Sequence, residues 1–266
     1  MKQDERAPFF HALQRARTAA YGPGEFVEQE SFMGATEILA LARQAGIAPG
    51  VSVLDLCCGV AGPGLLITRE LGCAYLGVDS SAGAVEIARE RAGDLPCRFE
   101  IARIPPLPDG PFDVVLLLET MLAFPDKGTL LQEIARVLTP AGRFAFTMEE
   151  GRPLTDAERE QMPDADTVWL TPLDEMLSCL ERAGLVVRFK EDHSRAHRAV
   201  ADSLIDAFTR DGAAIAARLG QQALDDLLAS HRLWSDWLGE GRVRKLAFVA
   251  SRSGGEVLDA EEQLGP

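Results

Sequence analysis

The chain has 266 residues and a formal net charge of −14, from 41 acidic and 27 basic side chains. Its hydrophobic fraction of 47% is typical of a globular protein and leaves room for one large α/β domain or two small ones. The acidic balance argues against nucleic acid and against an anionic membrane as partners, because both need a basic footprint. The sequence leaves the oligomeric state open, a homodimer included.

Three features bear on the cellular location. No run of about 18 apolar residues predicts a membrane-spanning helix. The opening residues 1–17 lack the apolar middle segment of a signal peptide. The five cysteines are an odd set without metal-type spacing, which fits a reducing compartment better than a disulfide scaffold. Together these features predict a cytoplasmic (cytosolic) protein.

Short apolar segments alternate with helical patterns through most of the chain, which predicts βαβ units and a parallel sheet. Most of these segments are apolar at nearly every position, as expected of strands that helices cover on both faces. A helical pattern over 130–138 follows Asp126, a suitable N-cap, and is stopped by Pro140 and Gly142. The first five strands are expected at Val51–Leu56, Ala74–Val78, Arg98–Ile101, Val114–Leu118 and Arg143–Thr147.

The second half of the chain begins with an acidic, proline-containing stretch, Glu149–Asp166, which predicts a loop. Thr171 and Pro172 then begin a helix that ends at Gly184. Strands are expected at Leu185–Lys190 and Val243–Ala250. The roughly 50 residues between them have helical spacings, which predict helices packed on one another, a lid over a substrate pocket, or both.

These elements predict an α/β fold with a Rossmann-like, seven-stranded, mostly parallel sheet and helices on both faces. We expect an N-terminal helical cap over residues 1–48 and a core formed by 49–194 and 242–253. A helical lid insertion is expected at 195–241, and a flexible tail at 254–266.

The strongest motif is the segment VLDLCCGVAGPG (53–64), in which an apolar strand runs into a turn with three glycines. Such glycines permit a tight turn and close approach of a ligand at the edge of an α/β sheet. A dinucleotide fingerprint requires G-x-G-x-x-G, whereas Gly59, Gly62 and Gly64 give G-x-x-G-x-G. The carboxylate of Asp55 would repel a pyrophosphate and would suit a ligand with an ammonium and a sulfonium. The turn therefore favours a cationic cofactor over a plain structural role.

A second acidic residue, Asp79, ends the segment LGVD (76–79). A carboxylate at this place can accept both hydroxyls of a ribose. A lone aspartate after a strand is more often a helix cap, but the nearby glycine turn favours the ribose role. Because NAD and S-adenosylmethionine both contain a ribose, Asp79 does not separate them.

Residues 51–148 resemble the cofactor domain of class I S-adenosylmethionine-dependent methyltransferases, in particular the small-molecule branch with the tocopherol and sarcosine methyltransferases. Two further segments carry the resemblance, PLPDGPFDVVLLLE (106–119) and EIARVLTPAGRFAFT (133–147). The resemblance implies that the cofactor is S-adenosylmethionine. Its methionine part would lie at Asp55 and Gly59, its ribose at Asp79, its adenine along 101–104 and its methyl group beside Glu119. The cofactor-binding residues implied are Asp55, Cys57, Gly59, Asp79, Ser80, Ala102, Arg103 and Glu119.

The chain departs from the family pattern at several positions. Glycine is usual where Cys57 and Ala61 stand, and because both replacements are small we expect the turn to survive with a less free backbone. Many relatives carry an aspartate near Ala102 that binds the adenine amino group, so that contact falls here to backbone groups or to Glu100. Related enzymes often have histidine where Ala123 stands, so no base is available there.

Candidate catalytic groups come from the strand ends. Methyl transfer needs a nucleophile aligned about 3 Å from the methyl carbon with water excluded. A base is needed only if that nucleophile carries a proton. Glu119 and the pair Glu149–Glu150 follow the fourth and fifth strands, at the edge where ligands bind. The pair fits a solvated acidic loop as well.

His193 and His197 are four residues apart and would share one face of a helix over 192–201. They fit a structural role, a substrate contact or base, or metal ligation together with Asp192. Two such histidines without a further clear ligand are a weak metal site, and no metal is predicted. The catalytic candidates are Glu119, His193 and His197.

Other polar and aromatic groups have simpler interpretations. His231 is expected to pack within the lid, and the vicinal cysteines 57 and 58 to serve as small packing residues. The segment Tyr21–Met33 either folds over the cofactor or packs as a helical hairpin on the sheet. In the first case four side chains would form an apolar wall beside the sulfonium: Tyr21, Phe26, Phe32 and Met33.

The sequence therefore predicts transfer of a methyl group from S-adenosylmethionine to an O, N or C nucleophile of a small molecule, such as a secondary metabolite. The alternative is a family member that binds the cofactor but catalyses another reaction, such as a cyclisation, or acts as a binding module. The missing histidine at Ala123 favours this alternative. The glycine spacing disfavours a nicotinamide dehydrogenase, and the charge disfavours a macromolecular acceptor.

Overall fold

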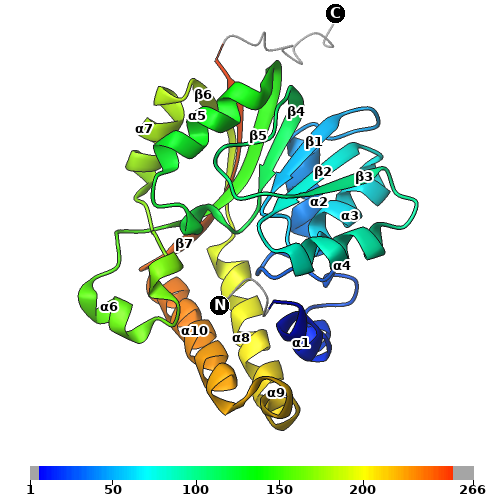
Figure 1. Cartoon of the computed structure of the whole chain (residues 1–266). Coiled ribbons are helices and arrows are strands. Elements are labelled where there is room, and N and C mark those ends of the chain that lie inside the picture. Colours follow the sequence, from blue (N-terminus) through cyan, green and yellow to red (C-terminus); the bar gives the residue numbers. More distant parts are fainter. Residues whose placement is uncertain (1–5, 254–266) are drawn as a thin grey trace, which may run out of the picture.

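A seven-stranded sheet with the order β3-β2-β1-β4-β5-β7-β6 forms the centre of the structure (Figure 1). This computed structural model describes residues 6–253, with side chains from residue 11 onward. Strand β7 is antiparallel to both β5 and β6, and the other pairs are parallel. All seven predicted strands are confirmed, at Ser52–Leu56 (β1), Ala74–Asp79 (β2), Cys97–Ile101 (β3), Phe112–Leu117 (β4), Leu138–Glu150 (β5), Leu185–Asp192 (β6) and Arg244–Arg252 (β7).

Alternate residues of the strands separate into two apolar cores, one on each face of the sheet, as a period of two requires. Val53 and Val114 belong to one core, and their neighbours Leu54 and Val115 belong to the other. Helices α2 (Ala35–Gln44), α3 (Gly62–Leu71) and α4 (Ala82–Ala92) contribute to the first core. Helices α5 (Lys127–Val137) and α7 (Leu173–Arg182) contribute to the second. Helices on both faces are thereby confirmed.

The connection after β5 differs from the predicted loop. Strand β5 continues to Glu150, and a short helix α6 (Asp156–Gln161) follows before the 3-10 turn Ala165–Thr167. A reciprocal capping box begins α6, because Thr155 Oγ1 accepts the N–H of Glu158 at 3.3 Å and Glu158 Oε2 accepts the N–H of Thr155 at 2.7 Å. The loop prediction was wrong here because six residues are too few for an apolar period.

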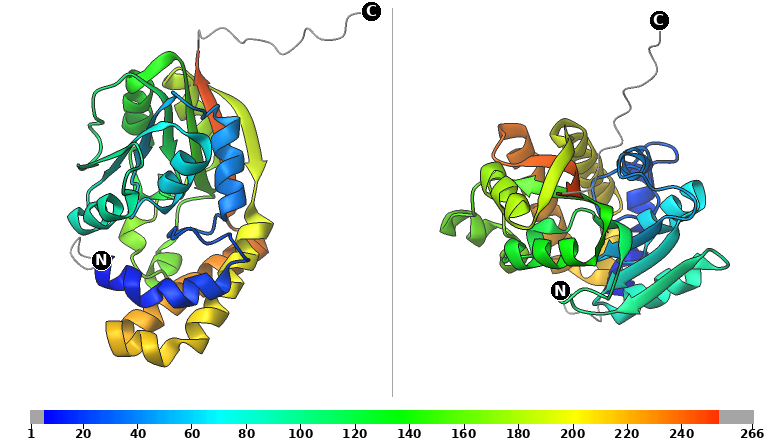
Figure 2. Two further views of the ribbon diagram at one scale, coloured as in Figure 1. Left: turned by 90° about the vertical axis from the view of Figure 1, so that its right-hand side faces the viewer. Right: turned by 90° about the horizontal axis from the view of Figure 1, so that it is seen from above.

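Four helices form a separate layer at one end of the sheet: α1 (Arg6–Ala20), α8 (Ser194–Arg210), α9 (Gly212–Leu219) and α10 (Gln221–Glu240). Figure 2 shows α1 lying against this group rather than on a face of the sheet. Leu13 of α1, Phe208 of α8, Ile215 of α9 and Leu224 of α10 share one buried cluster. The N-terminal helix and the insertion before β7 thus pack as one helical layer. The predicted tail, 254–266, lies outside the described residues.

Within the described part of the chain, every helix is too short or too polar to cross a bilayer.

Candidate active site

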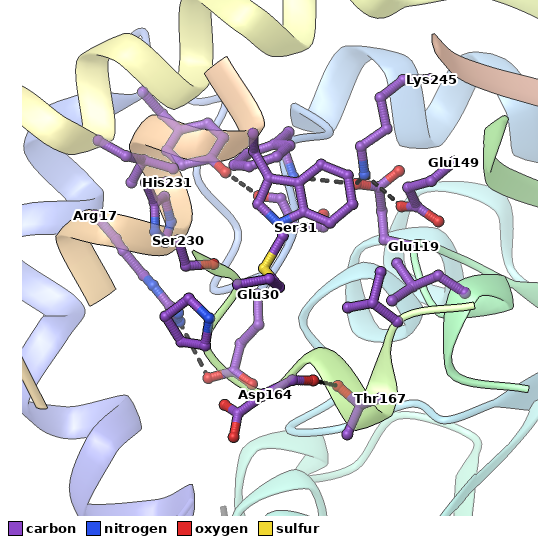
Figure 3. Close-up of a pocket in the computed structure, with 18 residues that line it drawn as sticks. Arg17, Glu30, Ser31, Glu119, Glu149, Asp164, Thr167, Ser230, His231 and Lys245 are labelled. Atoms are coloured by element: carbon purple, nitrogen blue, oxygen red, sulfur yellow. Dashed lines mark hydrogen bonds and ion pairs between the residues drawn. The ribbon is translucent and has the colours of Figure 1, made fainter. Parts of the chain in front are cut away.

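Two cavities meet beside the ends of the parallel strands. The larger, of about 580 Å³, is lined by residues that follow β1, β2, β3 and β4 and by residues 28–31. The smaller, of about 300 Å³, lies between this region and helices α8 and α10 (Figure 3). Both have Glu30, Ser31, Glu119 and Thr167 in their walls, so they adjoin. All eight predicted cofactor residues line the larger cavity, namely Asp55, Cys57, Gly59, Asp79, Ser80, Ala102, Arg103 and Glu119.

The turn after β1 reverses the chain through three left-handed residues. Cys57, Gly59 and Ala61 have φ values of +59°, +54° and +59°. A Cβ placed on Gly59 would meet no atom within 4 Å, so this backbone faces the open cavity. A Cβ on Gly62 would collide with the backbone oxygen of Val27. Of these two glycines, Gly59 leaves room for a ligand, whereas Gly62 allows the N-terminal segment to cross the turn.

The expectation that Cys57 leaves the turn intact leads to a stability prediction. Replacement of Cys57 by glycine should raise the free energy of unfolding by about 0.5–1 kcal/mol. The left-handed conformation costs about 1–2 kcal/mol for a residue with a Cβ, and glycine returns about half of that as unfolded-state entropy. Urea denaturation of the purified variant measures the change.

Cys58→Gly is the matched control, because Cys58 is buried, has no positive φ and packs against Gly77. It should lower the free energy of unfolding by about 2 kcal/mol through lost packing. Equal destabilisation by both variants would contradict the assigned strain at position 57.

Two buried carboxylates lie at the carboxyl ends of β1 and β2. Asp79 accepts the N–H groups of Gly59 at 2.9 Å and Ser81 at 2.8 Å. Asp55 accepts the hydroxyl of Tyr75 at 2.5 Å. Burial raises the pKa of Asp55 to about 7, the Tyr75 hydrogen bond opposes this rise, and nearby Asp79 adds to it. A cation in this cavity would relieve the unfavourable burial, so the donor set fits a ligand with an ammonium and ribose hydroxyls.

A lysine joins two further carboxylates at the boundary of the cavities. Lys245 of β7 donates to Glu119 Oε2 at 2.7 Å and to Glu149 Oε1 at 2.5 Å (Figure 3). Its ammonium lies 5.1 Å from the Phe32 ring centroid and 5.7 Å from that of Trp234. Against the effect of burial, the two carboxylates raise the pKa of Lys245 above its usual range. The three groups therefore form one hydrogen-bonded cluster.

The two members of the pair Glu149–Glu150 have different surroundings. The Glu149 side chain is 0% exposed and lines the smaller cavity, whereas Glu150 pairs with Arg244 at 2.8 Å outside both cavities. The interpretation as a solvated acidic loop is therefore wrong for Glu149. Lys245 was missed because its partners are far away in sequence, although its position directly before the apolar run Leu246–Ala250 was a signal.

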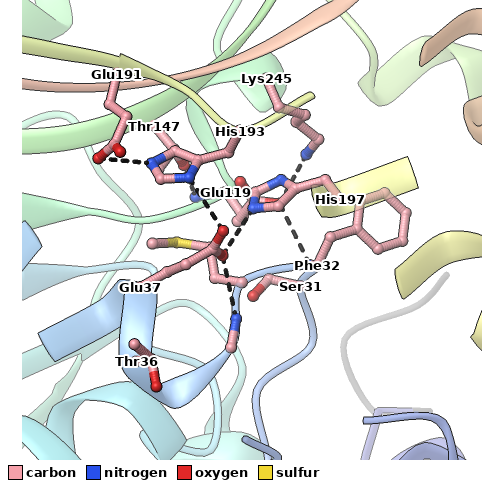
Figure 4. A network of polar contacts seen from close by, with 12 residues as sticks. Ser31, Phe32, Thr36, Glu37, Glu119, Thr147, Glu191, His193, His197 and Lys245 are labelled. Carbon is pink, nitrogen blue, oxygen red and sulfur yellow. Dashed lines mark hydrogen bonds and ion pairs between the residues drawn. The ribbon is translucent and has the colours of Figure 1, made fainter. Parts of the chain in front are cut away.

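His193 and His197 lie side by side at the start of α8, with their rings stacked at 5.7 Å (Figure 4). His193 Nδ1 and His197 Nε2 each lie 3.0 Å from a different oxygen of Glu37, which the sequence analysis had not singled out. His193 Nε2 lies 3.4 Å from Glu191. Neither histidine lines the two cavities, and Phe32 packs against His197 on the side of the smaller one. This placement gives a catalytic role of the two histidines no support.

The same three side chains offer a possible metal donor set. One donor atom from each of Glu37, His193 and His197 lies within 4.8 Å of the others. Hydrogen bonds from both imidazoles lower the pKa of Glu37 to about 2 against the effect of burial, and the Glu37 carboxylate raises the pKa of His193. Through its two 3.0 Å contacts, Glu37 of α2 holds both imidazoles and fastens the start of α8 to α2.

The aromatic residues of the N-terminal segment do not form one wall. Tyr21 and Phe32 line the smaller cavity, Phe26 packs on Tyr21, and Met33 is buried in the core of the sheet. His231 of α10 also lines the smaller cavity, where its Nδ1 donates to the Leu227 carbonyl at 2.8 Å and burial lowers its pKa to about 4. Of the four predicted wall residues, only Tyr21 and Phe32 therefore line either of the two cavities, and both line the smaller one.

Comparison with known proteins agrees with this geometry. Residues 54–146 match the family model of a methyltransferase domain. The chain is 28% identical to methyltransferase GfsG of Streptomyces halstedii over 207 residues, which cover 74% of this chain and 72% of that protein. It is 34% identical over 167 residues to 27-O-demethylrifamycin SV methyltransferase of Amycolatopsis mediterranei, covering 58% and 61% of the two chains.

A solved structure shares the fold. Phosphoethanolamine N-methyltransferase 2 of Haemonchus contortus, in complex with phosphomonomethylethanolamine and S-adenosylhomocysteine, superposes with a TM-score of 0.78 at 20% identity. The match covers 93% of this chain and 58% of the other. This likeness shows the fold, and the matched family model and the two relatives show that the chain carries an S-adenosylmethionine-dependent methyltransferase domain.

Proposed function

We propose that this enzyme methylates a small molecule, with the cofactor in the larger cavity and the acceptor in the smaller one. One observation carries the proposal: the two cavities adjoin at Glu119, and all eight residues predicted to bind the cofactor line the larger cavity. Bound S-adenosylmethionine would supply a methyl group already activated by its sulfonium.

The residues of the larger cavity have distinct proposed roles. Asp55 would bind the ammonium and Asp79 the two ribose hydroxyls. The loop from Ala102 to Ile104 would lie along the adenine. Glu119 would place a negative charge beside the sulfonium, since it lines both cavities and lies where they adjoin. The helical layer would exclude water from the acceptor, which suits a displacement reaction.

The acceptor is proposed to be a small molecule, for example a secondary metabolite. The names of the relatives include a rifamycin derivative, phosphoethanolamine and fatty acids as acceptors. We further propose a cytosolic location without nucleic-acid or membrane partners. This is supported by the net charge of −14 and by five cysteines that form no disulfide.

Asp55 should make cofactor binding depend on pH. Because its pKa is about 7 in the protein alone, its ionised form predominates only above neutral pH. If that form binds the ammonium, the dissociation constant of S-adenosylhomocysteine should rise below pH 7, by up to about tenfold per pH unit. Calorimetry between pH 5.5 and 8 measures this change.

Asp55→Asn is the control for this profile. The variant should bind S-adenosylhomocysteine more weakly at pH 8 and with little dependence on pH. A wild-type profile that stays flat, or an unchanged slope in the variant, would assign the ammonium to another group.

The proposed function itself is tested with purified protein and S-adenosylmethionine that carries a deuterated methyl group. Incubation with a panel of hydroxylated, amino and carboxylic metabolites should give a product heavier by one labelled methyl, together with S-adenosylhomocysteine. A product of unchanged mass formed without consumption of the cofactor would favour the cyclisation alternative. Absence of cofactor binding at millimolar concentration would refute the proposal.

A further inference from the structure

Two buried carboxylate oxygens at the boundary of the cavities have no hydrogen-bond partner. Lys245 donates hydrogen bonds to Glu119 Oε2 and Glu149 Oε1. The other two oxygens, Glu119 Oε1 and Glu149 Oε2, are buried without a donor from the described residues. Leaving a buried acceptor unsatisfied is costly, and native structures rarely do so without a reason. Since both residues line the smaller cavity, a ligand there can supply the missing donors.

The cluster also has an unbalanced charge. Two carboxylates surround one ammonium, and the three side chains are 0–6% exposed. With both carboxylates ionised, the cluster carries a net charge of −1 in a region of low dielectric, where an uncompensated charge is unfavourable. The sulfonium of the cofactor would neutralise it. An uncharged acceptor keeps the assembled site neutral, whereas an ammonium acceptor would add a positive charge.

The two carboxylates differ in their affinity for a proton. Against the effect of burial, Lys245 lowers the pKa of Glu119, whereas burial raises the pKa of Glu149 above its usual value. Two neighbouring carboxylates whose environments separate their pKa values commonly divide the roles of charge stabiliser and proton carrier. Glu119 borders both cavities, and Glu149 borders only the smaller one.

We propose that Glu149 is the general base of this methyltransferase and that the acceptor is an uncharged alcohol or phenol whose O–H donates to Glu149 Oε2. This inference rests on the proposed function. The acceptor oxygen forms the new C–O bond with the methyl carbon, and the C–S bond breaks with its electron pair going to sulfur. The hydroxyl proton goes to Glu149. The buried charge is zero before and after the step.

The rest of the smaller cavity fits such an acceptor. Its carboxylates are Glu30, Asp164, Glu119 and Glu149, against two cationic side chains, Arg17 and Lys245. Arg17 pairs with Glu30 at 3.1 Å, and Lys245 is held within the cluster. Anionic acceptors such as carboxylates and phosphate monoesters would meet repulsion here.

The remaining walls favour a flat ring. Tyr21, Phe32 and Trp234 contribute aromatic side chains to the walls of the smaller cavity. The volume of about 300 Å³ is at the lower end for ligand sites, so the cavity holds a small acceptor or one end of a larger one. A hydroxylated aromatic ring satisfies the shape, the charge and the missing donor together.

The test compares Glu149→Gln with Glu150→Gln, its neighbour outside both cavities. With an un-ionised alcohol or phenol, Glu149→Gln should lower kcat by about 10²- to 10⁴-fold, the usual contribution of a general base. It should also remove the rise of kcat/KM with pH. A phenol acidic enough to be ionised in solution should recover most of the rate. Glu150→Gln should stay within about threefold of the wild type.

Measuring the affinity for S-adenosylhomocysteine distinguishes a failure of the proposed function from a failure of the proposed base. Wild-type protein that does not bind it refutes the proposed function, whereas unchanged binding by Glu149→Gln shows that this variant is folded and that the lost rate concerns the base. Retention of the rate within threefold by Glu149→Gln, or methylation of only amines, carboxylates or phosphates, would overturn the inference.

The charge argument provides a measurement that needs no acceptor. At pH 8, Glu149→Gln should weaken the binding of S-adenosylmethionine about tenfold more than the binding of S-adenosylhomocysteine. The variant loses one buried negative charge, and only S-adenosylmethionine has a positively charged sulfur. Glu150→Gln should leave the ratio of the two dissociation constants unchanged. A ratio unaffected by Glu149→Gln would overturn the proposed charge balance and with it the assignment of the base.

Discussion

Replacement of Asp79 by alanine is expected to weaken the binding of S-adenosylmethionine and S-adenosylhomocysteine by about 10²- to 10⁴-fold. Two charge-assisted hydrogen bonds to the ribose, each contributing about 1.5–3 kcal/mol, would be lost. The carboxylate also accepts the N–H groups of Gly59 and Ser81, so the glycine turn loses an anchor. Isothermal titration calorimetry with S-adenosylhomocysteine measures the effect without the need for an acceptor.

Two variants control this experiment. Asp94→Ala removes an exposed aspartate beyond α4 and should leave the affinity unchanged. Asp79→Asn keeps one acceptor oxygen for the turn and should lose affinity with a smaller change in stability than Asp79→Ala. Affinity within threefold of the wild type in Asp79→Ala would remove Asp79 from the cofactor site and weaken the whole assignment of the larger cavity.

The residues around the larger cavity were predictable because their information is local in sequence. Asp55 and Gly59 belong to one strand and the turn that follows it, and Asp79 ends the next strand. Carboxyl ends of adjacent parallel strands meet at one edge of a sheet, so the order of the motifs sufficed to place these residues around one cavity.

The residues around the smaller cavity were less accessible to sequence reasoning because their contacts join distant segments. Lys245 is separated by 96 residues from Glu149 and by 126 from Glu119. Their meeting follows from the antiparallel register of β5 and β7, which places Glu149 opposite Lys245. No short sequence motif predicts this strand register, because it depends on how the chain returns to the sheet after three helices.

Histidines 193 and 197 show the limit of spacing arguments. Their separation of four residues predicts a shared helix face, and the stacked rings lie on one. Spacing does not tell which way that face points. It points to Glu37 near the start of α2, a residue with no motif of its own, instead of into either cavity. The adjacent positions of Glu149 and Glu150 likewise did not tell which of the two side chains points into the cavity. Successive strand residues face opposite sides of the sheet.

Replacement of Lys245 by methionine should lower the free energy of unfolding at pH 8 by about 3–5 kcal/mol, the usual cost of removing one partner of a buried ion pair. Methionine retains much of the apolar stem that lies near Phe32 and Trp234. Glu119 and Glu149 then remain buried without a cation, and this should raise both their pKa values in the folded state. Urea denaturation measures the loss.

The pH dependence gives this prediction a sign. A carboxyl group whose pKa is higher in the folded than in the unfolded state binds a proton on folding, so its folded form is favoured at low pH. The deficit of Lys245→Met should therefore shrink as the pH falls from 8 towards 5. Wild-type Glu119 behaves oppositely, because its pKa is lowered in the folded state and its stabilisation is lost as the pH falls.

A double variant and a surface control separate charge from packing. Glu149→Gln combined with Lys245→Met removes one of the two uncompensated carboxylates and should recover at least 1 kcal/mol relative to Lys245→Met alone. Lys190→Met, at an exposed position of β6, should change stability by less than about 0.5 kcal/mol. A Lys245→Met variant as stable as the wild type at pH 8 would mean that the two carboxylates do not depend on this ammonium. The neutral site proposed for methyl transfer would then lose its electrostatic basis.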